Sequence, residues 1–172
     1  MKAMISREVA RRGQAGDVKL DAGGIREIEF IVQSFQLIRG GRDPRLQERS
    51  LLGVLRTLGE IGQLPPDAVT GLREAYLFLR ATEHALQARD DAQTQALPQQ
   101  PEERERLAFA LGFPDAAAFE AALAAHRARV SAQFAVVVSA PEPESAADAP
   151  AGPWPSLWAM EQPAEEIGRA HV

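Results

Sequence analysis

The sequence predicts a mainly α-helical protein, an antiparallel helical bundle preceded by the remnant strand and Gly-Gly turn of an α/β domain. From Ile25 onward, apolar residues recur every three or four positions in five successive segments, as in helices with one buried face. Only one short run, Val18-Lys19-Leu20, reads as a strand. A lone strand has no ladder partner and is marginal by itself, so we expect the rest of its sheet elsewhere.

A turn and a long helix follow this strand. Residues 1–12 predict the end of an amphipathic helix that glycines within residues 13–16 break. The run Asp21-Ala22-Gly23-Gly24 predicts a turn, because paired glycines can take a positive φ and approach other groups closely. The helix that follows runs from Ile25 to about Arg39 and ends before a second glycine pair. Its apolar face is expected to consist of Ile25, Ile28, Ile31, Val32, Phe35 and Ile38.

Four more helices are predicted, joined by short connections typical of antiparallel neighbours. Their expected extents are Leu46–Leu64, about 25 residues from Pro65-Pro66, Pro101–Leu111, and Ala116 to about Val138. Residues 93–100 are expected to form a polar loop. Residues 141–172 are rich in Ala, Pro, Glu, Asp and Ser, which cannot bury enough surface to fold. We expect a disordered linker and a truncated end there.

Composition narrows the classes of function. The 172-residue chain has a net charge of −5, which argues against general nucleic-acid binding or attraction to an anionic membrane. It has no cysteine, which excludes disulfides and thiolate catalysis. No stretch approaches the roughly 20 apolar residues of a membrane helix, and the charged start is unlike a signal peptide. We therefore expect cytoplasmic localisation, without nucleic-acid or membrane partners.

The turn and the helix after it are the candidate site. The first amides of a helix lack partners and attract anions, and here they would point into the glycine turn. Lys19 precedes the turn, Arg26 follows it, and Glu27 and Glu29 lie near the helix start, where they could hold a divalent metal. In the alternative interpretation, the glycines form an ordinary turn and the acids only complement the positive helix end.

The histidines suggest no metal site, because they are far apart and lack clustered acids at ligand spacing. His84 falls beside apolar positions of a long helix, so we expect it in the core or at its boundary. His126 has charged and alanine neighbours and is expected to be exposed.

Two stretches of the chain resemble one family. The first runs from Lys19 to Gln33 and contains Gly-Gly-Ile-Arg-Glu-Ile-Glu-Phe, and the second runs from Tyr76 to Pro98 and contains Leu-Phe-Leu-Arg and Glu-His. Both, in this order, closely resemble the bifunctional glutamine synthetase adenylyltransferase/adenylyl-removing enzymes of bacteria, over about residues 1–140. The sequence of the first stretch is more similar to the N-terminal, deadenylating half of these enzymes than to the C-terminal, adenylylating half. Two departures are Asp21, where the family often has Gly, and Gln95, where it commonly has His.

The resemblance implies a chemistry and a set of site residues. Such enzymes transfer AMP from ATP to a tyrosine of glutamine synthetase with Mg²⁺, and remove it with phosphate, under control of PII protein and glutamine. ATP and Mg²⁺ are therefore the expected cofactors, and glutamine synthetase and PII the expected partners. The residues carried over are Glu27 and Glu29 as catalytic, Glu27 as metal ligand, and Lys19, Gly23, Gly24 and Arg26 as cofactor-binding.

The resemblance also implies a domain organisation. Residues 1–40 would be the C-terminal remnant of a nucleotidyltransferase domain, 41–140 a helical bundle domain, and 141–172 the linker and truncated end. The main metal ligands would lie upstream, so the chain alone is expected to be inactive. Two alternatives stay open: a helical module that binds PII, in which the glycines are only structural, and a fragment of a PII uridylyltransferase, which shares a looser Gly-Gly-Leu-Arg-Asp motif.

Overall fold

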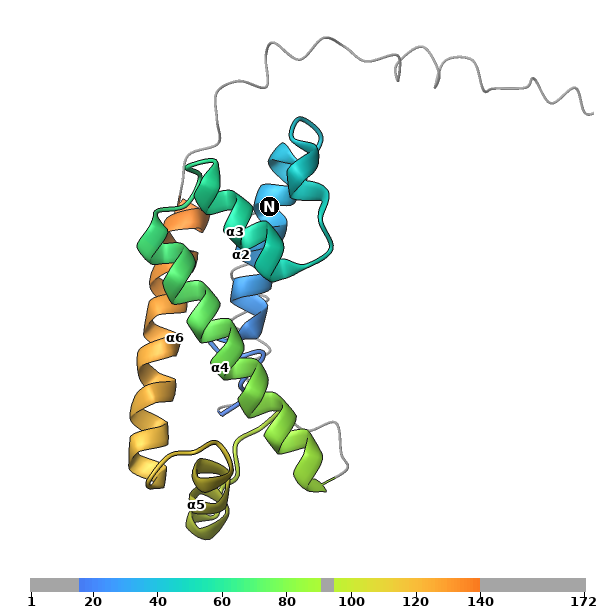
Figure 1. Cartoon of the computed structure of the whole chain (residues 1–172). Coiled ribbons are helices and arrows are strands. Elements are labelled where there is room, and N and C mark those ends of the chain that lie inside the picture. Colours follow the sequence, from blue (N-terminus) through green and yellow to red (C-terminus); the bar gives the residue numbers. More distant parts are fainter. Residues whose placement is uncertain (1–15, 91–94, 140–172) are drawn as a thin grey trace, which may run out of the picture. The chain divides into compact units, whose positions relative to one another are not determined.

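The computed structural model describes residues 16–90 and 95–139, and this part is mainly helical (Figure 1). The predicted helix in residues 1–12 and the predicted linker in residues 141–172 lie outside the described residues. Within them, the helices are α2 (Ile25–Arg39), the 3-10 helix η1 (Pro44–Gln47), α3 (Leu51–Glu60), α4 (Pro66–Asp90), α5 (Pro101–Ala110) and α6 (Ala116–Ser139). The expected helical bundle is thus confirmed over this part of the chain.

Helix bounds follow the sequence pattern except between α2 and α4. The single helix predicted for Leu46–Leu64 is wrong, because the structure has η1, a break and then the shorter α3. Each of the two starts has its own side-chain cap. Asp43 accepts a hydrogen bond from the Arg45 amide at 3.1 Å, and Ser50 accepts one from the Gly53 amide at 3.2 Å. Such caps satisfy amides that a continuous helix would have bonded to its own carbonyls.

The strand expected over Val18-Lys19-Leu20 does not form, and these residues are turns. Asp17 is the reason, because its side chain accepts hydrogen bonds from the amides of Lys19 at 2.7 Å and Leu20 at 2.9 Å. An aspartate that bonds backbone amides two and three residues on bends the chain. Only an isolated antiparallel bridge remains, between Asp17 and Ala96.

Helices α2, α3, α4 and α6 contribute to the core. Aliphatic side chains from α2, α3 and α4 are almost fully buried, and Phe119 and Val130 of α6 join them. The predicted face of α2 is confirmed at Ile25, Ile28, Ile31 and Val32, and Phe35 packs at its edge. Ile38 is an exception: it lies in the last turn of α2 and its side chain is 62% exposed.

Helices α2 and α6 run parallel, although contacting residues such as Glu27 and Ser131 are 104 positions apart in the chain. The contacts between them advance in the same direction along both helices. These contacts join Gly23 to Arg127, Glu27 to Ser131 and Phe30 to Phe134. Helix α4 runs antiparallel to α6, since Glu74 pairs with Arg129 whereas Phe78 stacks on His126. The start of α2 is therefore placed against the middle of α6.

Both expectations for the histidines are wrong. His84 is exposed, whereas the half-buried His126 stacks on Phe78 with ring centroids 4.6 Å apart. The Nδ1 atom of His126 is buried and has no hydrogen-bond partner. Burial, and then the charge of Arg129, lower the pKa of His126, while Glu74 acts in the opposite direction. The alanines next to His126 in the sequence are exposed, so they gave no sign that the His126 ring faces inward. Phe78, Phe113 and Phe119 pack against one another, His126 stacks on Phe78, and we call these four residues the aromatic cluster.

Stability is expected to fall as the pH falls from 7.5 to 5.5. The pKa of His126 is lower in the folded chain than in the unfolded chain, where it is near 6.5. The unfolded state therefore binds more protons below that pH, and the stability present above it is lost as the pH falls toward the folded pKa. Urea unfolding at several pH values across this range measures the free energy of unfolding. This free energy should decrease less with falling pH for His126→Phe, which keeps an aromatic ring stacked on Phe78. His84→Gln, at an exposed position, should leave the pH dependence of the free energy of unfolding unchanged. Equal effects of the two variants would contradict the assignment of this pH dependence to His126.

No helix among the described residues is both long enough and apolar enough to span a bilayer.

Candidate functional site

The glycine turn, residues 21–24, is built by two close backbone approaches. Gly23 has φ +73°, as expected for a left-handed turn position, and a Cβ there would lie 2.3 Å from the carbonyl oxygen of Arg127. Gly24 has an ordinary φ of −82°, but a Cβ there would lie 2.6 Å from the carbonyl oxygen of Lys19. One glycine therefore lets the turn touch α6, and the other lets it fold back on itself.

The turn also occupies the helix start that was expected to be open to anions. The first three amides of α2 already donate to backbone carbonyls of the preceding chain. These hydrogen bonds run from Ile25 to Val18 at 3.3 Å, from Arg26 to Lys19 at 3.0 Å, and from Glu27 to Gly24 at 3.1 Å. The expectation of unpaired amides is wrong, because the bend at Asp17 turns these carbonyls toward the helix.

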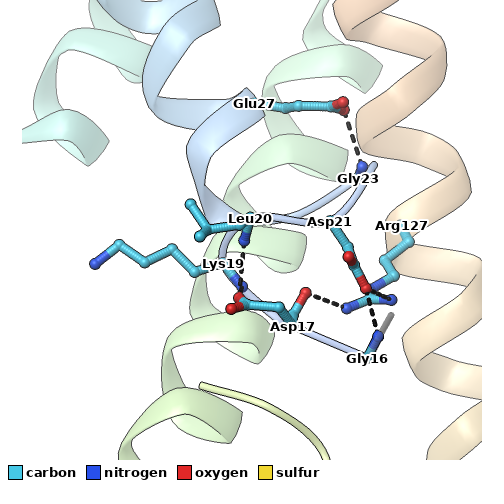
Figure 2. Close-up of polar contacts among 8 residues, drawn as sticks. All are labelled: Gly16, Asp17, Lys19, Leu20, Asp21, Gly23, Glu27 and Arg127. Carbon is cyan, nitrogen blue, oxygen red and sulfur yellow. Dashed lines mark hydrogen bonds and ion pairs between the residues drawn. The ribbon is translucent and has the colours of Figure 1, made fainter. Parts of the chain in front are cut away.

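The side chain of Glu27 points toward α6 and links the glycine turn to that helix (Figure 2). Its side chain accepts hydrogen bonds from the Gly23 amide at 2.9 Å and from the Ser131 hydroxyl at 3.3 Å, and the residue is 5% exposed. Burial raises the pKa of Glu27, against the lowering effect of these two bonds. Glu27 thus bonds two groups that are over 100 residues apart in the chain.

Arg127 of α6 holds the other side of the turn, as Figure 2 shows. Its guanidinium donates to the Asp17 carbonyl oxygen at 2.7 Å and lies 3.4 Å from the Asp21 carboxylate. The same Asp21 oxygen accepts a hydrogen bond from the Gly16 amide at 2.8 Å. The negative charge that Asp21 adds beside the turn is therefore offset by Arg127. The sequence gives no signal for this pair, because the two residues are 106 positions apart.

Lys19 points the other way, toward α4. Its Nζ lies 3.6 Å from one oxygen of Glu83, and the guanidinium of Arg80 pairs with the other oxygen. We call these three residues the Glu83 cluster. In Figure 2 the side chain of Lys19 extends away from the carboxylate of Glu27, so these two predicted site residues do not converge. Arg80 and Glu83 were not predicted as site residues, although both lie in the second stretch that carries the family resemblance.

Arg26 and Glu29 lie on the outer side of α2. They face each other at 3.9 Å, and their side chains are 63% and 26% exposed. An exposed pair at this distance is worth little to stability. Of the predicted charged residues, Lys19, Arg26 and Glu29 are therefore accessible to a ligand, whereas Glu27 is enclosed.

Magnesium needs several oxygen ligands in near-octahedral order, usually including water. Within residues 16–90 and 95–139, no three His, Asp or Glu side chains come close enough together to hold a metal ion. Glu27, the predicted metal ligand, is bonded to Gly23 and Ser131 instead. The described residues therefore do not fit a magnesium site by themselves.

Comparisons with known proteins match nearly the whole chain. A family model described as GlnD PII-uridylyltransferase matches residues 1–138. The chain is 48% identical over 171 residues to the bifunctional glutamine synthetase adenylyltransferase/adenylyl-removing enzyme of Pseudomonas putida. It is 52% identical over 160 residues to the enzyme of the same name from Hahella chejuensis, and 52% over 157 residues to that from Stenotrophomonas maltophilia.

These matches cover 98%, 92% and 91% of the chain but 18%, 16% and 17% of the respective relatives. The chain therefore spans less than a fifth of the length of the relatives that it matches. The resemblance that was expected over about residues 1–140 extends over almost the whole sequence.

Proposed function

Because the chain belongs to the family described as GlnD PII-uridylyltransferase, we propose that it is one segment of an enzyme that adenylylates and deadenylylates glutamine synthetase. Identities near one half over nearly the whole chain support this proposal, since these relatives carry that activity in their names. The single observation that carries it is that the resembling stretch from Lys19 to Gln33 forms a tightly built glycine turn and the start of α2.

In the proposed enzyme, residues 1–40 complete a nucleotidyltransferase domain and residues 41–140 form the helical domain behind it. ATP and phosphate are the co-substrates, magnesium is held by residues outside the described part, and glutamine synthetase and PII are the protein partners. The protein is expected in the cytoplasm. AMP transfer and removal are displacements at phosphorus, for which the protein mainly supplies positioning and charge.

The described residues contribute positioning. Glu27, Arg127 and the two glycines fix the turn against α6, while Lys19, Arg26 and Glu29 are left nearer the surface. A turn fixed in this way holds its flanking cations without a loss of chain entropy when substrate binds.

A chimaera tests the proposed function. The 172-residue chain alone should show neither AMP transfer nor AMP removal, because less than a fifth of the relatives' length is present. The same chain, replacing the matching stretch of the Pseudomonas putida enzyme, should support phosphate-dependent removal of AMP from adenylylated glutamine synthetase, in which phosphate displaces the tyrosine and the AMP leaves as ADP. Turnover by the isolated chain, or a folded chimaera that forms no ADP from adenylylated glutamine synthetase and phosphate, would refute the proposal.

Conservative substitutions test the roles predicted for Glu27 and Glu29. In the chimaera, Glu27→Gln should keep the rate of phosphate-dependent AMP removal within about threefold, since a glutamine oxygen can accept the same Gly23 hydrogen bond. Glu27→Ala should lower both stability and activity, because the Gly23 amide is then buried without a partner. A loss above about a hundredfold in a stably folded Glu27→Gln variant would instead assign a catalytic or metal-binding charge to Glu27. Glu29→Gln is the matched variant at the other predicted catalytic residue, whose side chain is 26% exposed.

The description of the matching family model favours a second candidate, a segment of a PII uridylyltransferase. Nucleotide preference separates the two candidates. A chimaera built on the adenylyltransferase should use ATP and not UTP, whereas productive transfer of UMP would support the second candidate.

A further inference from the structure

The Glu83 cluster contains more positive charge than its carboxylate needs. Glu83 is 2% exposed, and a carboxylate that is removed from water needs a cation close by. Lys19 approaches one of its oxygens and Arg80 the other. The three charged side chains of the Glu83 cluster sum to +1, although the whole chain has a net charge of −5. The neighbouring Asp17 carboxylate bonds the backbone amides of Lys19 and Leu20. The second cation is thus in excess of simple neutralisation.

Both cations also reach the surface. The side chains of Lys19 and Arg80 are 29% and 37% exposed. An ammonium group has three N–H donors and a guanidinium group has five, so one shared carboxylate cannot use them all. Since Glu83 is buried and bonded to both, it holds the two cationic groups close together. The cluster is therefore a pair of cationic side chains that meet at one buried carboxylate and are partly exposed to solvent.

From this arrangement we propose that Lys19 and Arg80 form a binding site for a phosphate group, and that Glu83 is their positioning residue. A phosphate has several acceptor oxygens and can bridge two cations that lie side by side. The guanidinium fork of arginine matches two phosphate oxygens, and lysine adds a point charge. The bound phosphate would join the chain just before the glycine turn to α4, two parts of the chain more than 60 residues apart. The site itself follows from the geometry, and only the biological source of the phosphate rests on the proposed function.

The two lysines of the sequence make this site easy to observe. Lys2 and Lys19 are the only lysines in the 172-residue chain, so selective isotope labelling of lysine gives two sets of NMR signals. Sodium phosphate, titrated at constant ionic strength against sodium chloride, should shift the Lys19 signals in a saturable way. The Lys2 signals should not move. An unmoved Lys19 would overturn the proposal.

Substitutions at Arg80 test whether the site needs both cations. Arg80→Gln should weaken phosphate binding about tenfold, as expected for the loss of one charge-assisted hydrogen bond. Arg80→Lys keeps the charge without the fork and should give an intermediate loss. Arg56→Gln is the matched control, because Arg56 also pairs with a glutamate on its own helix but is 72% exposed. Equal effects of Arg80→Gln and Arg56→Gln would refute the site; if Arg80→Gln fails to fold, the comparison of Arg80→Lys with Arg56→Lys decides.

Two further probes, acetate and ADP, identify the ligand class by comparison with orthophosphate. Acetate should bind much more weakly than orthophosphate, and equal binding would show that phosphate is the wrong class. If ADP shifts Lys19 at concentrations no higher than orthophosphate does, the source is a nucleotide phosphate; if only orthophosphate acts, the source is free phosphate. Both results support the site. Because binding is measured on the isolated chain, it is independent of the activity of the chimaera, and either proposal can fail alone.

Discussion

Gly23→Ala is expected to destabilise the chain by about 3–5 kcal/mol, which is large for one methyl group. Two costs add at this position. Alanine is strained at φ +73°, and its Cβ would lie 2.3 Å from the Arg127 carbonyl oxygen and 2.6 Å from the Arg127 Cα. Because the atoms that it would meet are backbone atoms of α6, a side-chain rotation cannot relieve the overlap. The glycine turn would have to separate from α6 and lose the Glu27 hydrogen bond.

Gly62 offers a matched control for this substitution. It has nearly the same φ, +69°, but no atom lies within 4 Å of the position of an added Cβ. Gly62→Ala should therefore cost only about 1 kcal/mol, from backbone strain alone. Urea unfolding of both variants, followed by circular dichroism, measures the difference. Similar losses would mean that the turn does not pack against α6 as described.

Phe119→Ala is expected to cost about 3–5 kcal/mol, because it empties the centre of the aromatic cluster. Phe119 is 1% exposed, and its ring lies 5.9 Å from that of Phe78 and 5.7 Å from that of Phe113. The cluster joins α4 and α6 through the chain between α5 and α6, so its loss should loosen both helices.

Phe109 provides the control, since the same residue type is 83% exposed at the end of α5. Phe109→Ala should change the free energy of unfolding by no more than about 0.5 kcal/mol. If chemical unfolding showed comparable losses for the two phenylalanines, the packing assigned to Phe119 would be wrong.

Residue spacing within the sequence correctly predicted the helices whose bounds and buried faces depend on neighbouring residues. The three-four spacing of Ile25, Ile28 and Val32 places α2 and its buried face correctly, and the prolines that open α4 and α5 mark their starts. The helix predicted for Leu46–Leu64 failed because two short caps, at Asp43 and Ser50, outweighed a continuous apolar pattern.

The candidate site depended on contacts that the sequence does not reveal. The motif identified the glycine turn, and Gly23 has the positive φ that was expected. The orientation of Glu27 toward α6 and of Lys19 toward α4 depends on Ser131 and Glu83, which are distant in sequence. Short-range spacing could place both side chains near the turn but not on opposite sides of it. The single aspartate at position 17, which changes a predicted strand into turns, acts through its side chain rather than through its strand propensity.

The long separation between the turn and its partners has a consequence for biosynthesis. Glu27 meets Ser131 across 104 positions, and the Asp17 carbonyl meets Arg127 across 110. A ribosome adds about 5–20 residues each second, so the N-terminal stretch waits at least several seconds before its docking surface emerges. During that interval α2 and α4 can already associate, but the residues of α6 that contact the bend before α2 have not yet been synthesised. Its closure is therefore expected to be a late event in folding, dependent on completion of the last described helix.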